Sequence, residues 1–250
     1  NTSDSSKPEE STDDTTEATT LGKPKDAETI GAIAIVDKAA YEYYNFVQST
    51  ADSFIGAINS AADKLSGKAQ VYSIIAPTSI DITLDDATRA SLNTSDQQKA
   101  INYLYGSMKQ SVKVVDLYQT LRSHKDEYIY YRTDHHWTTL GAFYAYQYLS
   151  EKNPRKEDYS ITEVSDRFLG TNYSKALMSY IQPDSILRFD PKDAENSFSV
   201  EIFDSAGKSI KRMDSFYDEE YLKVKDKYSY FLSGNNPVTV VKKNGAAEGE

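Results

Sequence analysis

The sequence predicts an α/β fold with a largely parallel sheet, because short apolar runs alternate with segments that have the helical period. The clearest unit spans 71–116, where an apolar run at 71–76 stops at Pro77 and a second run, at 112–115, ends at Asp116. A helical pattern lies between the two runs. Strands that alternate with helices in this way are typical of a parallel sheet.

The other elements of the first half each have a local signal. The run 30–36 is typical of a buried strand, and the apolar positions of 47–65 recur at the helical period, with Gly67 as the expected C-cap. Asp96 or Ser95 is the expected N-cap of the helix between the two apolar runs of 71–116. A short helix at 117–123, a strand at 128–131, and a helix capped by Thr138 or Thr139 complete this half.

The second half, from Asn153, changes to short mixed segments rich in tyrosine. Residues 200–204 and 209–212 form two strand patterns around a turn that contains Gly207, which predicts a hairpin. Residues 237–241 form a last apolar run.

Composition excludes several classes of protein. The 250 residues carry a net charge of −10, which removes the electrostatic attraction on which most nucleic-acid binding depends. No apolar run reaches the roughly 18 residues of a membrane span. The chain has no cysteine, so it has no disulfide, no thiolate metal site and no cysteine nucleophile.

Residues 1–28 form an acidic leader rich in serine and threonine, which we expect to be disordered because it has almost no apolar side chains to bury. Such a leader suits a tether that holds a domain away from a bacterial membrane or wall after export. A disordered tail of a cytoplasmic protein is the alternative. Residues 29–250 are then the folded domain.

All three histidines lie between positions 124 and 136, and two of them are adjacent, after Asp134 and before Trp137. A carboxylate that holds the Nδ1 atom of a histidine fixes the tautomer of a general base, so Asp134 and His136 are candidates for a catalytic pair. Two alternatives remain open. In the first, the histidines cap a helix or satisfy buried carbonyls. In the second, they bind a metal, although no HxxxH or HxH spacing is present.

The string that contains these residues resembles the DHHW family of exported bacterial proteins, which is related to the alginate O-acetyltransferases. Other segments agree with the family over about 29–245. The matching segments are Tyr130-Tyr131-Arg132-Thr133-Asp134-His135-His136-Trp137-Thr138, Pro77-Thr78-Ser79, Asp116-Leu117-Tyr118, Phe168-Leu169-Gly170-Thr171 and Phe231-Leu232-Ser233-Gly234-Asn235-Asn236-Pro237.

The resemblance implies a circularly permuted SGNH-hydrolase fold with three layers and a mainly parallel sheet, and a β-rich insertion at about 154–236. It places the catalytic acid and base on Asp134 and His136, and it assigns no role to His135. In the family the nucleophilic serine follows the Gly-Asn-Asn-Pro segment, in a Lys-Asp-Ser type of sequence that this chain does not contain. We therefore expect the C-terminal part of the domain to be missing from these 250 residues.

Further polar residues are candidates for contacts with substrate or an oxyanion. Asn235 or Asn236 would donate to an oxyanion, or would cap a turn; Arg132 would bind an anionic group, or would form an ion pair; and His135 lies beside the catalytic pair. Ser79 and Ser233 are weak candidates for the nucleophile, since each also suits an ordinary turn.

The resemblance predicts an acyl-transfer enzyme, either an O-acetyltransferase or an O-acetylesterase, that acts on a cell-surface polysaccharide outside the cell or in its envelope. A membrane-bound acyltransferase would supply the acyl group, and no metal or other cofactor is required. A non-catalytic protein that binds a surface polymer is the alternative from another class. Metal-dependent hydrolysis is a third hypothesis.

Overall fold

The computed structural model describes residues 22–150, 154–177, 180–192 and 198–243. Most of the predicted leader therefore lies outside the described residues. Its last part is exposed and runs along the folded body, where the main-chain N–H of Lys25 donates to the Thr88 hydroxyl at 2.9 Å. Within the described ranges, no helix is both long enough and apolar enough to cross a membrane.

The first apolar run is not one strand, because it is divided between the end of β1 (Glu28–Ile30) and the buried β2 (Ile33–Val36). With β3 (Ala39–Glu42), these strands form a three-stranded antiparallel sheet in the order β1-β2-β3. The chain reverses between Ile30 and Ile33, which pair with each other. Gly31 has φ +58°, a conformation that glycine adopts without strain, and this turn splits the run.

The central unit is the predicted strand–helix–strand arrangement. α1 (Gln48–Lys64) precedes β4 (Val71–Ile75), and α2 (Ser79–Ile82), α3 (Asp86–Ser91) and α4 (Gln97–Gly106) lead to β5 (Val112–Asp116). Asp96 caps α4 by accepting from the N–H of Lys99 at 2.9 Å. β4 and β5 pair in parallel, whereas every other strand pairing in the described part of the chain is antiparallel, so the expectation of a mainly parallel sheet is wrong. The reason is that most of the other strands that are neighbours in the sequence and pair with each other are joined by tight turns.

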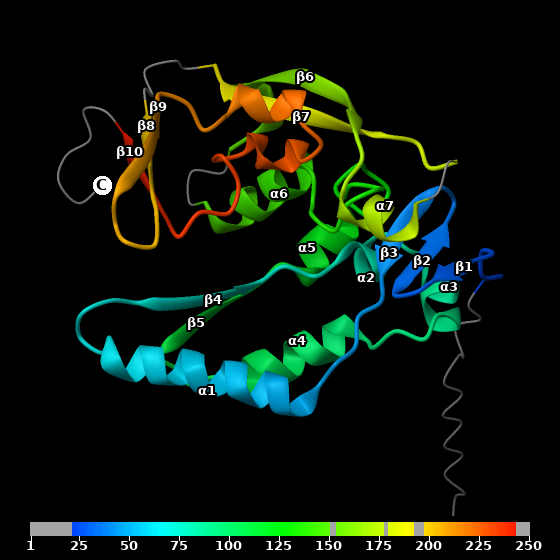
Figure 1. Cartoon of the computed structure of the whole chain (residues 1–250). Coiled ribbons are helices and arrows are strands. Elements are labelled where there is room, and N and C mark those ends of the chain that lie inside the picture. The colour runs from blue at the N-terminus through cyan, green and yellow to red at the C-terminus, as the bar shows by residue number, and fades with distance from the viewer. Residues whose placement is uncertain (1–21, 151–153, 178–179, 193–197, 244–250) are drawn as a thin grey trace, which may run out of the picture.

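α1 and α4 lie together along β4 and β5 at one side of the molecule (Figure 1). The apolar stripe of α1 is buried only in part: Ala51, Ile55 and Ala62 are buried, but Phe54 is exposed. A sheet of two strands is too narrow to cover the whole stripe.

α5 (Tyr118–Ser123) and α6 (Thr139–Leu149) pack against each other between the central unit and the second half. The strand predicted at 128–131 is wrong, since only an isolated antiparallel bridge joins Tyr130 to Trp137. Within the described ranges this aromatic run pairs with no strand, because the chain folds back on itself directly after it. Thr138 is the N-cap of α6, accepting from the N–H of Gly141 at 3.3 Å.

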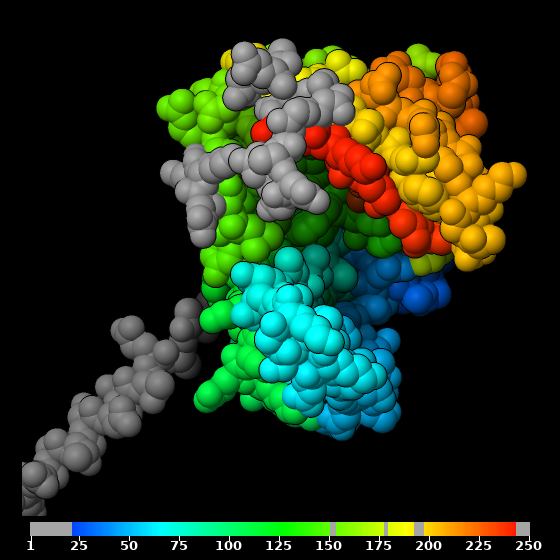
Figure 2. All heavy atoms as spheres, turned by 90° about the vertical axis from the view of Figure 1, so that its left-hand side faces the viewer, coloured from blue at the N-terminus to red at the C-terminus, as the bar shows by residue number. Residues whose placement is uncertain are grey.

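The second half contains two further antiparallel sheets. β6 (Tyr159–Phe168) pairs with β7 (Asp184–Pro191), and α7 (Thr171–Ala176) lies between them in sequence. β8 (Phe198–Phe203) and β9 (Ser209–Met213) form the predicted hairpin, and β10 (Val238–Lys243) pairs with the other edge of β8. Figure 2 shows β10, in red, across the upper part of the molecule and α1 below it, with the surface hollowed between them.

Candidate active site

The aspartate and the two histidines lie in a short loop that closes on itself. The N–H of Tyr131 donates to the carbonyl of His136 at 3.2 Å, and the N–H of Thr138 donates to the carbonyl of Ile129 at 2.9 Å. The loop 131–136 therefore projects its central side chains from two joined ends, directly before α6.

Asp184, the first residue of β7, holds this loop from outside. Its carboxylate accepts the main-chain N–H groups of Arg132 at 2.9 Å and Thr133 at 2.8 Å, and the Thr133 hydroxyl at 2.5 Å. The hydroxyl of Tyr128 donates to the same carboxylate at 2.5 Å. Asp184 is fully buried, so these donors replace water around its charge.

Two more segments fix the loop. The carbonyl of Arg132 accepts from the N–H of Ala40 in β3 at 2.7 Å, and the carbonyl of Thr133 accepts from the N–H of Tyr173 in α7 at 3.0 Å. Gly170 lies so close to Asp134 that a Cβ atom there would be 2.3 Å from the Cβ of Asp134. Only glycine allows α7 to begin against this aspartate.

Asp134 is 2% exposed, and each of its carboxylate oxygens accepts two hydrogen bonds. Oδ1 accepts from Nδ1 of His136 at 2.6 Å and from the N–H of the same residue at 3.0 Å. Oδ2 accepts the N–H of Thr171 at 2.8 Å and its hydroxyl at 3.1 Å. Burial acts to raise the pKa of Asp134, but the hydrogen bonds from His136 and Thr171 together outweigh it and hold the pKa well below its usual range. The carboxylate is therefore ionised at neutral pH.

His136 is held on two sides. Its Nδ1 faces Asp134, and the ring of Tyr228 stacks on the imidazole with the centroids 3.7 Å apart and the planes inclined by 8°. Burial, and then the charge of Asp134, raise the pKa of Tyr228 to about 12, so the stacked ring stays neutral. The Nε2 atom of His136 has no hydrogen-bond partner among the residues that the structure describes, and its side chain is 31% exposed.

His135 lies beside His136, with ring centroids 3.8 Å apart. Its Nδ1 atom is 2.7 Å from the hydroxyl of Thr171, and its side chain is 40% exposed. Burial of the ring lowers the pKa of His135 from its usual value. The two imidazoles thus share one face of the loop.

The same three side chains are the group that could hold a metal ion. One ligand atom from each of Asp134, His135 and His136 lies within 4.8 Å of the others. The donor set suits a transition metal, but both Nδ1 atoms and both carboxylate oxygens already take part in the hydrogen bonds above. A metal would have to use the two Nε2 atoms or displace these bonds.

Arg132, although adjacent in sequence, is turned away from the pair. Its Nη2 donates to the carbonyl of Pro183 at 3.0 Å, its Nε is 3.5 Å from Asp184, and its guanidinium lies over the Tyr128 ring at 4.9 Å. These contacts are those of an ion-paired residue that supports the loop.

Asn235 and Asn236 have no hydrogen bond to the catalytic pair within the described ranges. Asn236 donates to the carbonyls of Leu232, Ser233 and Gly234 and so closes a turn. Asn235 is exposed. The hydroxyl of Ser233 donates to Asp218 at 2.6 Å, and Ser79 is buried at the start of α2. No contact in the described part of the chain brings either serine to His136.

Sequence reasoning missed three parts of the site: the segment 170–171, Asp184 and Tyr228. Thr171 and Gly170 belong to a segment that matched the family, but nothing in that segment pointed to the aspartate. Asp184 and Tyr228 carried no signal at all, because they are one of many acids and one of 20 tyrosines.

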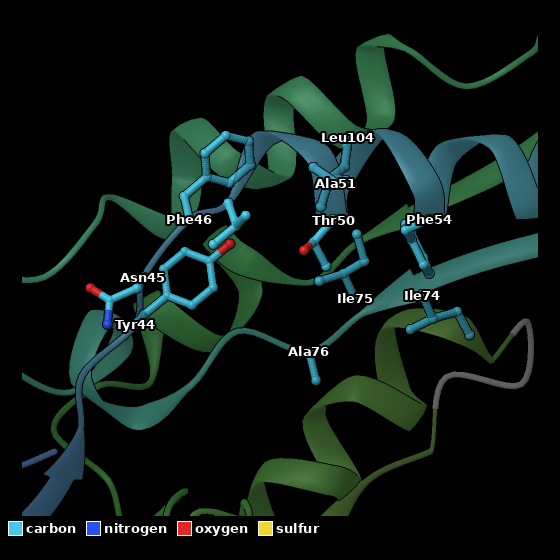
Figure 3. Close-up of a pocket in the computed structure, with 11 residues that line it drawn as sticks. Tyr44, Asn45, Phe46, Thr50, Ala51, Phe54, Ile74, Ile75, Ala76 and Leu104 are labelled. Atoms are coloured by element: carbon cyan, nitrogen blue, oxygen red, sulfur yellow. The ribbon is translucent and has the colours of Figure 1, made fainter.

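A separate apolar cavity of about 520 Å³ lies between the start of α1 and the end of β4 (Figure 3). Phe46, Phe54, Ile74 and Leu104 supply much of its lining, and none of the predicted site residues borders it.

Comparison with solved structures finds the same fold in two of the bacterial proteins described below, and a partial likeness in the third. A DHHW family protein from Eubacterium siraeum superimposes with a TM-score of 0.75 at 20% identity, covering 90% of this chain and 75% of that one. Bacillus cereus PatB1, solved with a sulfonyl adduct, gives a TM-score of 0.66 at 20% identity, covering 86% and 75%. The O-acetyltransferase domain of Pseudomonas putida AlgJ gives 0.48 at 18% identity, covering 63% and 64%.

Comparison with curated protein sequences finds no match. The sequence model described as "DHHW protein" matches residues 2–250, which is nearly the whole chain. The loop 131–136 contains the Asp-His-His part of the family's Asp-His-His-Trp string. The tryptophan that completes the string, Trp137, pairs with Tyr130. This chain therefore belongs to the DHHW family.

Proposed function

We propose that this protein is the Asp-His part of an acyl-transfer enzyme, either an O-acetyltransferase or an O-acetylesterase. The observation that carries the proposal is the hydrogen bond of 2.6 Å from Nδ1 of His136 to the buried, ionised Asp134. It requires a proton on Nδ1, so in the neutral ring Nε2 is left as a base. The α/β fold that the chain shares with PatB1 also agrees with this proposal.

In this mechanism Nε2 of His136 accepts the proton of a serine hydroxyl as the serine oxygen attacks the acyl carbonyl, and the alcohol of the donor then leaves with that proton. Water or a sugar hydroxyl next attacks the acyl-serine and gives its own proton to the same Nε2, which returns a proton to the serine oxygen as the acyl–serine bond breaks. Asp134 stabilises the imidazolium in both steps. We propose that the serine comes from a segment C-terminal to Asn236, as the resemblance to permuted SGNH hydrolases implies.

We further propose that the acceptor is a cell-surface polysaccharide, that the protein acts outside the cell or in its envelope, and that a membrane-bound acyltransferase supplies the acyl group. These proposals come from the resemblance to the exported DHHW proteins and the alginate O-acetyltransferases. The acidic leader supports them, because a tether of this kind suits a domain that works near a surface.

The test measures release of p-nitrophenol from p-nitrophenyl acetate by the full-length gene product. We expect the wild type to be active and His136→Ala to lose at least about a hundredfold, the usual contribution of a general base. His124→Ala is the matched control, because His124 stacks on Tyr144 away from the pair. A wild type that binds polysaccharide but hydrolyses no ester would instead support a non-catalytic binding protein.

A further inference from the structure

The hydroxyl of Thr171 lies between Asp134 and His135. Its Oγ1 atom is 3.1 Å from Oδ2 of the aspartate and 2.7 Å from Nδ1 of the histidine. A threonine hydroxyl has one proton, so it can donate to only one of these two atoms.

The proton positions follow from the charge of the carboxylate. Asp134 is ionised and can only accept, so the hydroxyl proton of Thr171 points to Oδ2. The hydroxyl oxygen must then accept from Nδ1 of His135, which therefore carries a proton. The other carboxylate oxygen of Asp134 supports the same assignment. Oδ1 lies 3.7 Å from Nδ1 of His135, and its negative charge favours a proton on that nitrogen.

Burial keeps the ring of His135 neutral at neutral pH, because it lowers the pKa of His135. The charges of Asp134 and Glu42 act to raise this pKa, whereas His136 and Lys175 act to lower it. Lys175 and Glu42 also pair with each other. A neutral ring with a proton on Nδ1 has an unprotonated Nε2, and that atom has no partner in the described part of the chain.

We infer that one carboxylate orients two imidazoles, His136 directly and His135 through Thr171, and that Nε2 of His135 accepts a hydrogen bond from a hydroxyl group of the acyl acceptor. The inference rests on the proposed function for the identity of that ligand. His136 then takes the proton of the attacking hydroxyl, while His135 holds a neighbouring hydroxyl. Thr171 is a positioning residue, and a polyhydroxylic acceptor such as a sugar fits two adjacent bases better than water does.

The proton on His135 can be measured without any substrate. The chain has three histidines, so ¹⁵N-histidine labelling gives few signals, and single substitutions assign them. We expect His135 to be the Nδ1–H tautomer in the wild type and in Thr171→Ser. Thr171→Val removes the acceptor of that proton, and we expect it to move the equilibrium toward Nε2–H while the His124 signals stay unchanged. An Nε2–H tautomer in the wild type, or no change in Thr171→Val, would overturn the inference.

The role in acceptor binding is tested with the full-length protein, p-nitrophenyl acetate as donor and methyl glucoside as acceptor. We expect the ratio of transfer to hydrolysis to fall about tenfold in His135→Ala, the effect of one lost hydrogen bond, and to stay at the wild-type value in His124→Ala. An unchanged ratio in His135→Ala would refute this role. If the wild type releases no p-nitrophenol, the proposed function itself fails, whereas the tautomer measurement still decides how Thr171 orients His135.

Discussion

Replacing Asp134 by asparagine tests the whole hydrogen-bond arrangement, because the two side chains have nearly the same shape. The carboxylate accepts four hydrogen bonds while 2% exposed. An asparagine has only one oxygen, so its NH₂ group must face either the N–H of His136 or the N–H of Thr171. One buried donor is left without an acceptor in either orientation.

The size of the effect follows from these contacts. An unsatisfied buried donor costs about 1–3 kcal/mol, and each remaining bond to a charge loses roughly 1 kcal/mol when the charge is removed. The asparagine oxygen keeps two of the four bonds, so we expect Asp134→Asn to lower the free energy of unfolding by about 3–5 kcal/mol at pH 7. For a chain of this size the melting temperature should fall by roughly 6–20 °C.

The pH dependence gives a second check. Because the pKa of Asp134 is depressed in the fold, its contribution is complete above the unfolded pKa of about 3.9 and is lost as the pH falls toward the folded pKa. The difference between wild type and Asp134→Asn should be present at pH 7 and should shrink below about pH 4. Urea denaturation at several pH values measures both quantities.

The matched control is Asp126→Asn. Asp126 has a side chain that is 87% exposed and, among the described residues, pairs only with Lys125, so this variant should stay within about 0.5 kcal/mol of the wild type. The reasoning is refuted if the Asp134 variant unfolds as the control does at pH 7, or if its deficit persists unchanged at pH 3.

Substitutions at three further positions, Gly170, Asp184 and Tyr228, test the surroundings of the loop. Gly170→Ala forces a Cβ atom into the aspartate and should destabilise the protein by about 1–3 kcal/mol, whereas Gly56→Ala, in open space on α1, should stabilise it by up to about 1 kcal/mol in the same thermal unfolding assay. Asp184→Ala leaves the buried N–H groups of the loop unpaired and should cost about 3–5 kcal/mol in urea. Tyr228→Phe keeps the ring on His136 and should keep ester hydrolysis, but Tyr228→Ala should reduce it by up to about tenfold, and equal rates would exclude a role for stacking.

Local signals in the sequence predicted local structure well. The apolar runs that became β4 and β5, the helix caps Asp96 and Thr138, and the hairpin of β8 and β9 all depend on neighbouring residues. The sheet as a whole was not predictable in this way. A run such as 30–36 looks like one strand until the positive φ of Gly31 divides it, and whether strands pair in parallel depends on the length of each connection.

The residues of the site fall into the same two groups: those that their sequence neighbours position, and those that only the fold brings together. Asp134 and His136 are two residues apart, so the hydrogen bond between them is a property of the loop, and its chemistry could be recognised from the sequence. Thr171 and Tyr228 reach the same loop from distant segments, and only the fold shows that they do. A search of the sequence for chemically reactive residues finds the pair but not the groups that orient it.

The contacts of Asp184 make the sheet of β6 and β7 a necessary part of the site. Without this carboxylate, the N–H groups of Arg132 and Thr133 would face a buried region with no acceptor, and the loop could not keep its shape. α7, in the connection between the same two strands, supplies Thr171. One antiparallel hairpin thus provides both the support under the loop and the hydroxyl that contacts both Asp134 and His135. A DHHW chain from which residues 154–191 were removed would keep the Asp-His string in its sequence but would lose the geometry that makes His136 a base.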